Sequence, residues 1–193
     1  MFVHNLLFFI VKKLKIFYNV NMKLILANKE DLKEIKILIN KSILNMNNLG
    51  IKIWNEYYPN ECFLGDIENN NLYLLKKDNK IISVATMCSC DESGNEFKWS
   101  GTKNSKFLTR FAVSVDFLNM GYGKLMLKKL IELAQGMGIE SLRLAVAKIN
   151  TPAIKLYEKF GFKKVEGSFF NEFITECDNE EYGYELLLEK DTD

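Results

Sequence analysis

The chain has 193 residues, 48% of them hydrophobic, and its 26 basic and 25 acidic side chains leave a formal net charge of +1. This length and apolar content suit one globular domain with a sizeable core. Because the sequence has no basic stripe with interleaved aromatic residues, we expect no nucleic-acid partner.

The first 21 residues form an apolar segment with three lysines and no acid. Its apolar run, Leu6–Val11, is far shorter than the roughly 20 residues that a membrane span requires, and no cleavage signal follows it. Three interpretations stay open: a loose tail or start-site artefact, a helix docked on the domain, or a helix at a membrane surface. We expect the folded domain to cover residues 22–190.

The domain begins with a predicted strand and a predicted helix. Lys23–Ala27 is a short, mostly apolar run that is typical of a strand, and Asn28 can cap the following helix. Apolar residues at helical spacing continue to Ile43, and the helix is expected to fray over residues 45–50. The mixed segment that follows allows one short helix, over residues 62–67.

Strands and helices then alternate along the chain. Strands are expected at residues 72–75 and 81–88, joined by a tight turn, and at 107–115, 141–147, 162–166 and 182–188. Helices are expected at residues 121–135 and 151–160. This order predicts a single α/β (α+β) domain with a mixed central sheet flanked by helices.

A glycine-bracketed loop lies between a predicted strand and a predicted helix. Backbone N–H groups at a helix start lack intrahelical partners, and the helix dipole adds positive charge, so a diphosphate can bind there. Glycine lets the phosphates approach the backbone. A Walker-type P-loop is excluded, because Leu118 stands where its first glycine is required. The candidate cofactor residues here are Leu118, Asn119, Met120, Gly121, Tyr122, Gly123 and Lys124.

About 30 residues downstream, Asn150–Phe162 places an Asn before a short helix, a Tyr on that helix and a Gly-Phe pair after it. Ala153, Leu156 and Phe160 recur on one face and are expected to pack on the core. Tyr157 is one step round from Leu156 and can face the strand ends. Taken alone, such a Tyr is more often a core residue than a catalytic one.

Together, the two motifs resemble the GNAT superfamily of acyl-CoA-dependent N-acyltransferases. The second reproduces the family pattern Asn-x-x-Ala-x-x-x-Tyr-Glu-x-x-Gly-Phe, and the first keeps both glycines but has Leu118 at its Gln/Arg position. The resemblance spans roughly residues 22–188. It implies acetyl-CoA as the acyl donor, no metal, and direct acetyl transfer to the amine of a small molecule or peptide.

The resemblance also implies roles for individual residues. Tyr157 would be the general acid that protonates the leaving thiolate, and Asn150 would hydrogen-bond the pantetheine arm. The backbone of Val113 and Val115 would pair with the pantetheine amides. A backbone N–H near Ala112 or Val113 would face the thioester oxygen, where negative charge develops.

An acceptor pocket is suggested by a further resemblance, to a bacterial GNAT subgroup with a Trp, a Tyr-Pro pair and an Asp-Ile pair. A pocket with aromatic walls, a cation and carboxylates would suit a small amine, including one that bears a carboxylate. Structural roles, as core tryptophans or a helix cap, are the alternative. Asp66, Glu56 and Glu61 are candidates for the base. The residues that carry this resemblance are Trp54, Tyr58, Asp66, Trp99 and Arg110, with Tyr184 and Glu185 in the last strand.

The remaining predictions concern the setting of the protein. We expect the protein to be cytoplasmic and its four cysteines to be reduced thiols. These are Cys62, Cys88, Cys90 and Cys177. The single histidine, His4, offers no zinc ligand set. A CoA-binding module without turnover, a membrane-attached protein and an enzyme for a longer acyl-CoA remain as alternatives. A homodimer is expected at the level of the family alone.

Overall fold

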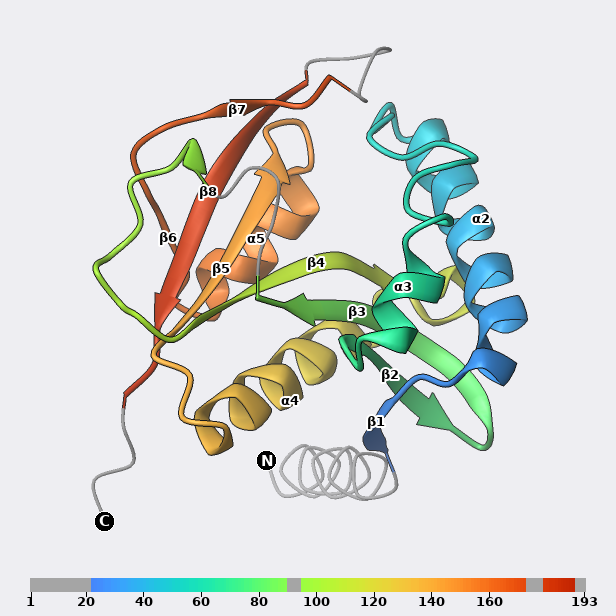
Figure 1. Cartoon of the computed structure of the whole chain (residues 1–193). Coiled ribbons are helices and arrows are strands. Elements are labelled where there is room, and N and C mark those ends of the chain that lie inside the picture. The colour runs from blue at the N-terminus through green and yellow to red at the C-terminus, as the bar shows by residue number, and fades with distance from the viewer. Residues whose placement is uncertain (1–21, 90–94, 173–178, 190–193) are drawn as a thin grey trace, which may run out of the picture.

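A mixed sheet of eight strands forms the centre of the computed structural model, which describes residues 22–89, 95–172 and 179–189. The strand order is β1-β2-β3-β4-β5-β8-β6, with β7 paired to β8 (Figure 1). Every pairing among these strands is antiparallel except that of β4 with β5. The strands are β1 Lys23–Leu26, β2 Leu72–Lys77, β3 Lys80–Cys88, β4 Ser105–Val113, β5 Ser141–Ala147, β6 Lys163–Lys164, β7 Phe169–Phe170 and β8 Glu180–Leu187.

Helices cover the sheet and define two hydrophobic cores. The first core joins α4 and α5 to the sheet and contains Met126, Leu127, Leu142 and Tyr157. The second core packs α2 and α3 on the other face, and these two helices lie together at the right of Figure 1. The α-helices are α2 Leu32–Asn48, α3 Phe63–Glu68, α4 Tyr122–Gly136 and α5 Thr151–Lys159, and the short 3-10 helices are η1 Lys29–Asp31 and η3 Val115–Phe117. The predicted fold class is confirmed.

Local sequence signals account for several of the boundaries. Asn28 caps the first helical segment through a reciprocal pair of bonds with Asp31, at 3.1 and 3.2 Å. Asp78 and Asn79 form the tight turn between β2 and β3 with φ values of 48° and 62°, which these residue types tolerate better than most. Strand β5 has the predicted bounds, 141–147.

Other boundaries differ from the predictions. Helix α2 does not fray at residue 45 but continues to Asn48, because Met46 packs against the second core and its carbonyl accepts from Ile51 N–H. Strand β4 starts at Ser105 and ends at Val113, so Val115 lies in η3 and not in a strand. The strand predicted at 162–166 is limited to Lys163–Lys164, and β7 was not predicted.

The N-terminal extension, residues 1–21, lies outside the described part of the chain, so its three interpretations stay as they were. The described domain begins at Met22, whose side chain is buried in the first core. No helix within the described ranges combines the length and apolar character needed to cross a membrane.

Candidate functional site

Strands β4 and β5 pair over only three residues and then separate. Their parallel register joins 105–107 to 141–143, although β4 continues to Val113 and β5 to Ala147. Beyond Phe107, β4 pairs only with β3 among the described strands, so its edge on the β5 side is unpaired. Figure 1 shows the two strands starting side by side and pointing apart. An open strand edge of this kind can bind an extended ligand that carries amide groups.

Helix α4 begins beside this opening with backbone N–H groups that no described residue accepts. Leu125 is the first residue of the helix whose amide is bonded, to Gly121 O at 3.1 Å, and no side chain caps the helix. The amides of residues 119–124 are therefore available to a ligand. Partial positive charge from the helix dipole favours an anion at this position.

The two glycines of the loop have different structural roles. Gly121 has a φ of 87°, in the left-handed region that favours glycine, and the space beside its Cα is empty. Gly123 instead lies against the protein, since a β carbon there would be 3.5 Å from Val113 Cγ2 and 3.6 Å from Leu156 Cδ2. Gly121 thus leaves room for a ligand, and Gly123 lets α4 approach β4 and α5.

The remaining residues of the loop are mostly exposed. Leu118 and Met120 keep 39% and 63% of their surface accessible, while Asn119 has a φ of 60°. Lys124 is exposed and can supply a cation, whereas Tyr122 is buried in the first core and packs edge-on against Phe117. Binding at this loop would consequently rest on backbone amides and Lys124.

Tyr157 lies in the first core, close to the opened edge of β4. Its ring centroid is 6.4 Å from that of Phe111 on β4 and 5.7 Å from that of Phe162. The hydroxyl bonds to no described residue, yet it is not among the fully enclosed unpaired polar atoms of the described residues, so it keeps some accessible surface. Burial raises the pKa of the phenol well above its ordinary value of 10. The phenol therefore keeps its proton at neutral pH.

Asn150 is the N-cap of α5. Its Oδ1 accepts from Ala153 N–H at 3.3 Å, and Pro152 occupies the first turn, where its missing N–H does not matter. The cap uses the acceptor atom of the amide, while no described residue accepts from Nδ2. Asn150 can therefore fix the start of the Tyr157 helix and still donate a hydrogen bond to a ligand.

A β-bulge in β4 determines which face Arg110 occupies. The register against β3 shifts between Thr109 and Ala112, and Arg110 has a φ of 51°. Leu108 belongs to the first core, so regular alternation would direct Arg110 toward that same face. The bulge places it on the α2/α3 face instead, where it bonds Asp66. Such backbone strain costs about 1–3 kcal/mol and is concentrated at functional sites.

Arg110 and Asp66 form a closed bidentate ion pair. Nε and Nη2 donate to the two carboxylate oxygens at 2.8 Å each, and Thr86 Oγ1 donates to the same carboxylate at 2.8 Å. The side chains are 14% and 10% exposed. Burial alone would lower the pKa of the guanidinium, but the hydrogen bond and charge of Asp66 outweigh it and raise that pKa. With both oxygens engaged, Asp66 is poorly placed to act as the base.

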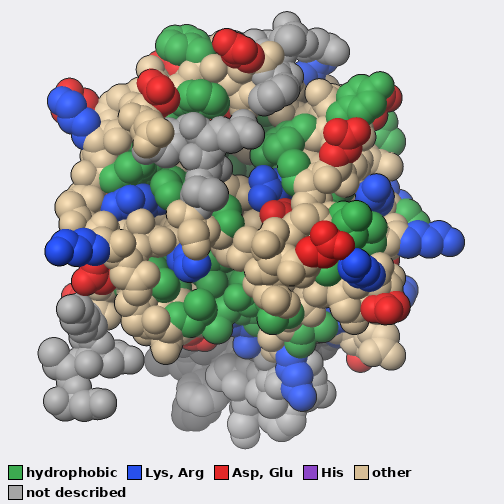
Figure 2. All heavy atoms as spheres, in the orientation of Figure 1, with side chains coloured by type: hydrophobic (Ala, Val, Ile, Leu, Met, Phe, Trp, Pro, Cys, Tyr) green, Lys and Arg blue, Asp and Glu red, His purple; other side chains and the backbone are tan. Residues whose placement is uncertain are grey.

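Two of the predicted aromatic residues, Tyr58 and Trp54, lie on the same side of the sheet as this ion pair. Tyr58 is close enough to contribute to the electrostatics of Arg110. Trp54 packs against the second core and lines a groove of about 660 Å³ between α2 and residues 52–57. Glu56 also lines this groove, and Glu61, like Glu56, is exposed. The face drawn in Figure 2 mixes hydrophobic, basic and acidic side chains without a broad area of one charge.

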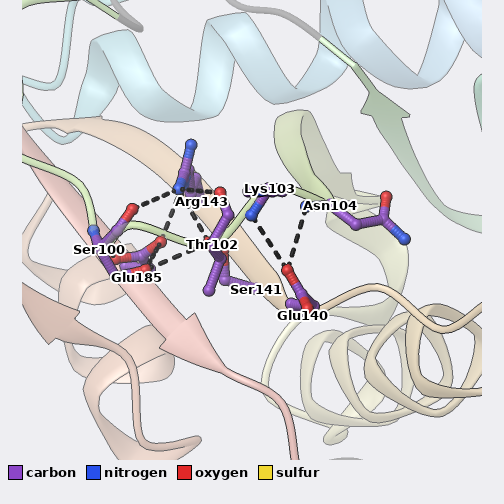
Figure 3. Close-up of polar contacts among 8 residues, drawn as sticks. All are labelled: Ser100, Thr102, Lys103, Asn104, Glu140, Ser141, Arg143 and Glu185. Atoms are coloured by element: carbon purple, nitrogen blue, oxygen red, sulfur yellow. Dashed lines mark hydrogen bonds and ion pairs between the residues drawn. The ribbon is translucent and has the colours of Figure 1, made fainter.

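Trp99 belongs to a separate, buried polar cluster. Its ring packs edge-on against Phe107, and the Arg143 guanidinium lies 5.4 Å from its centroid. Arg143 Nε donates to Glu185 at 2.8 Å, and its Nη2 donates to Ser100 O at 3.0 Å (Figure 3). These contacts fasten the segment 95–104 to β5 and β8. Trp99 thus contacts Phe107 and Arg143, and its place in one acceptor pocket with Asp66 and Arg110 stays a prediction.

Sequence reasoning did not single out Arg143, although one signal was present. A lone charged residue in the otherwise apolar strand SLRLAVA requires a buried partner, because an unpaired buried charge is strongly unfavourable. Thr86 was also missed, since nothing in an apolar strand marks a threonine as a partner of Asp66. Cys62 and Cys88 take part in no disulfide, and Cys90 and Cys177 lie outside the described residues. Within the described ranges no group of three metal-ligating side chains occurs.

The comparisons with known proteins give the family. The model of the Acetyltransferase (GNAT) family matches residues 41–162, more than half of the chain. The chain belongs to the GNAT family. No curated protein matches the sequence.

Solved structures share the GNAT fold at low sequence identity. A GNAT-family acetyltransferase from Streptococcus agalactiae is 21% identical with a TM-score of 0.75, covering 89% of this chain and 98% of its own. A ribosomal-protein alanine N-acetyltransferase from Escherichia coli is 17% identical with a TM-score of 0.67, covering 89% and 97%. An acetyltransferase from Salmonella typhimurium, solved with its cofactor acetyl-CoA, is 17% identical with a TM-score of 0.63, covering 89% and 96%.

Proposed function

We propose that this GNAT protein is an acetyl-CoA-dependent N-acetyltransferase that transfers the acetyl group directly to an amine. The observation that carries the proposal is the separation of β4 from β5, with the unbonded amides of residues 119–124 and the Tyr157 hydroxyl beside the opening. Acetyl-CoA has an amide-containing arm, a diphosphate and a thioester, which match these three features in turn.

In the proposed complex, residues 119–124 hold the diphosphate through backbone amides, aided by Lys124. The open edge of β4 at Ala112 and Val113 pairs with the pantetheine amides, and Asn150 Nδ2 donates to the same arm. Val115, which lies outside the strand, contributes through the turn that links β4 to the loop. The exposure of Leu118 and Met120 leaves the backbone as the main source of affinity.

The proposed reaction forms one C–N bond and breaks one C–S bond. The amine lone pair attacks the thioester carbonyl, a backbone N–H near Ala112 stabilises the oxyanion, and the carbonyl re-forms as the thiolate leaves. Tyr157 gives its proton to the thiolate, the attacking nitrogen loses one proton to water, and the Tyr157 phenolate regains a proton from water. Burial raises the pKa of the phenol, and the same apolar surroundings would raise the pKa of the thiol formed, which keeps the transfer feasible.

The test is release of CoA thiol from acetyl-CoA by the full chain, in the presence of amines of several chemical classes. We expect release that depends on the amine, and an acetylated amine that mass spectrometry detects in equal amount. Thiol release at the rate of the protein-free control with every amine would contradict the proposal. The chain would then be better described as a CoA-binding module.

A further inference from the structure

We propose that the acceptor is a small amine that carries a carboxylate, such as a free amino acid, and that Arg110 binds this carboxylate. The inference rests on the proposed function, because it assigns the acceptor side of the same site. Its starting point is the incomplete pairing of Arg110. A guanidinium has five N–H donors, and Asp66 takes those on one edge, through Nε and Nη2.

The second edge of the Arg110 guanidinium has no acceptor within the described residues. Nη1 donates to none of them, and the outer edge formed by Nη1 and Nη2 can accept a carboxylate in the same bidentate geometry that Asp66 uses. The side chain keeps 14% of its surface exposed, so a solute can reach it. A buried guanidinium with unused donors is unfavourable unless a ligand or water completes it.

A second polar group beside Arg110 also lacks a partner. Thr109 Oγ1 is fully enclosed and has no hydrogen bond. Thr109 pairs with Thr86 across β3 and β4, so both side chains project from the same face, and Thr86 bonds Asp66. A buried hydroxyl without a partner costs about 1–3 kcal/mol, and rotation of the Thr109 side chain toward a ligand oxygen held at Arg110 would remove that cost.

The charge and the location of the pair narrow the chemistry of the ligand. Asp66 already neutralises Arg110, so one further negative charge is tolerated better than the double charge of a phosphate. Arg110 lies two residues from Ala112, roughly 7 Å along the strand, where the oxyanion donor is proposed. A carboxylate at Arg110 and an amine at the thioester can therefore belong to one small molecule.

The experiment compares matched acceptors on the full chain. The probes are free amino acids, their primary amides, and the amines that remain after decarboxylation, each with two readouts: the thermal unfolding midpoint and the rate of thiol release. We expect amino acids to raise the midpoint at about 10 mM while the amides do not. The kcat/KM for the best amino acid should exceed that of its amide by at least about tenfold.

Variants assign this preference to Arg110. Arg110→Lys keeps the positive charge but loses the planar fork, so it should raise KM for the amino acid about tenfold or more and leave the amide unaffected. Thr109→Val should weaken amino-acid binding without lowering the unfolding midpoint of the ligand-free protein, because it removes an unpaired hydroxyl. If Arg110→Lys does not fold, Thr109→Val is the variant that tests the site. Lys41→Met, which removes an exposed cation of α2, is the control and should change neither readout.

The assignment to a carboxylate would be overturned if amino acids and their amides shifted the unfolding midpoint equally, or if no amino acid shifted it. It would also be overturned if only the decarboxylated amines were acetylated, or if Arg110→Lys lowered kcat/KM equally for the amino acid and its amide. The proposed function fails separately. If acetyl-CoA neither raises the midpoint nor loses its acetyl group, acetyl transfer is wrong, whereas amino-acid binding that Thr109→Val weakens would still support the site at Arg110.

Discussion

Replacing Tyr157 with Phe is expected to lower kcat by about 10²–10⁴-fold, the usual contribution of a positioned general acid, and to leave acetyl-CoA affinity nearly unchanged. The phenyl ring keeps the contacts with Phe111 and Phe162. Because the hydroxyl bonds to no described residue, its removal leaves no orphaned partner and should not perturb the fold. Single-turnover thiol release and calorimetric titration of acetyl-CoA measure the two quantities.

Tyr73→Phe is the matched control. Tyr73 packs against the same core from β2, and burial also raises the pKa of its phenol, but it is remote from the opening between β4 and β5. Its kcat should be unchanged. Since the pKa of Tyr157 lies above 10, the phenol should cause no loss of activity between about pH 7 and 9. Wild-type kcat in Tyr157→Phe would remove Tyr157 from the mechanism.

Replacing Arg143 with Met is expected to lower the free energy of unfolding by about 3–5 kcal/mol, because it leaves a buried carboxylate without its cation. Glu185 and Arg143 are only 6% and 11% exposed. The substitution also removes the bonds to Ser100 and Thr102 that hold the segment 95–104. Urea unfolding monitored by circular dichroism measures the change. Lys148→Met, which breaks a more exposed pair with Glu180, should cost at most about 1 kcal/mol.

The same cluster predicts a dependence of stability on pH. Burial alone would raise the pKa of Glu185, but its bonds to Arg143 and Ser100 outweigh burial and hold the pKa below its ordinary value of 4.5. Glu185 therefore stabilises the fold fully above that value and loses this contribution as the pH falls through its folded pKa. Glu185→Gln should flatten the acid limb of the stability curve. An unchanged acid limb, or a small loss in Arg143→Met, would contradict the assigned role of the pair.

Local chemistry made much of the fold predictable from the sequence. Capping at Asn28, the Asp-Asn turn and the mostly apolar run of residues 141–147 act over a few neighbouring residues, and each appears in the structure. The separation of β4 from β5, in contrast, could not be predicted from local sequence. It depends on how two strands more than 25 residues apart are held by α4 and by the segment 95–104, and no local pattern encodes it.

The acceptor residues show the same limit. Sequence resemblance grouped Tyr58, Asp66 and Arg110 with Trp99, but it gave no indication that Trp99 also packs against Arg143. The bulge at Arg110 could not be read from the sequence, because no glycine or asparagine marks its positive φ. Regular alternation would have placed Arg110 on the opposite face, away from Asp66. Its pairing with Asp66 is therefore a property of the folded sheet.

Calorimetric titration of acetyl-CoA into the full chain tests the central claim most directly, with Gly121→Ala and Gly136→Ala alongside. The account predicts saturable binding by the wild type, and affinity about five- to tenfold lower in Gly121→Ala, where a β carbon strains the left-handed backbone by about 1 kcal/mol or more. Gly136, at the other end of α4 and with open space around it, should tolerate alanine with affinity unchanged. Absence of binding at millimolar acetyl-CoA, or equal affinity in all three proteins, would contradict the assignment of this loop.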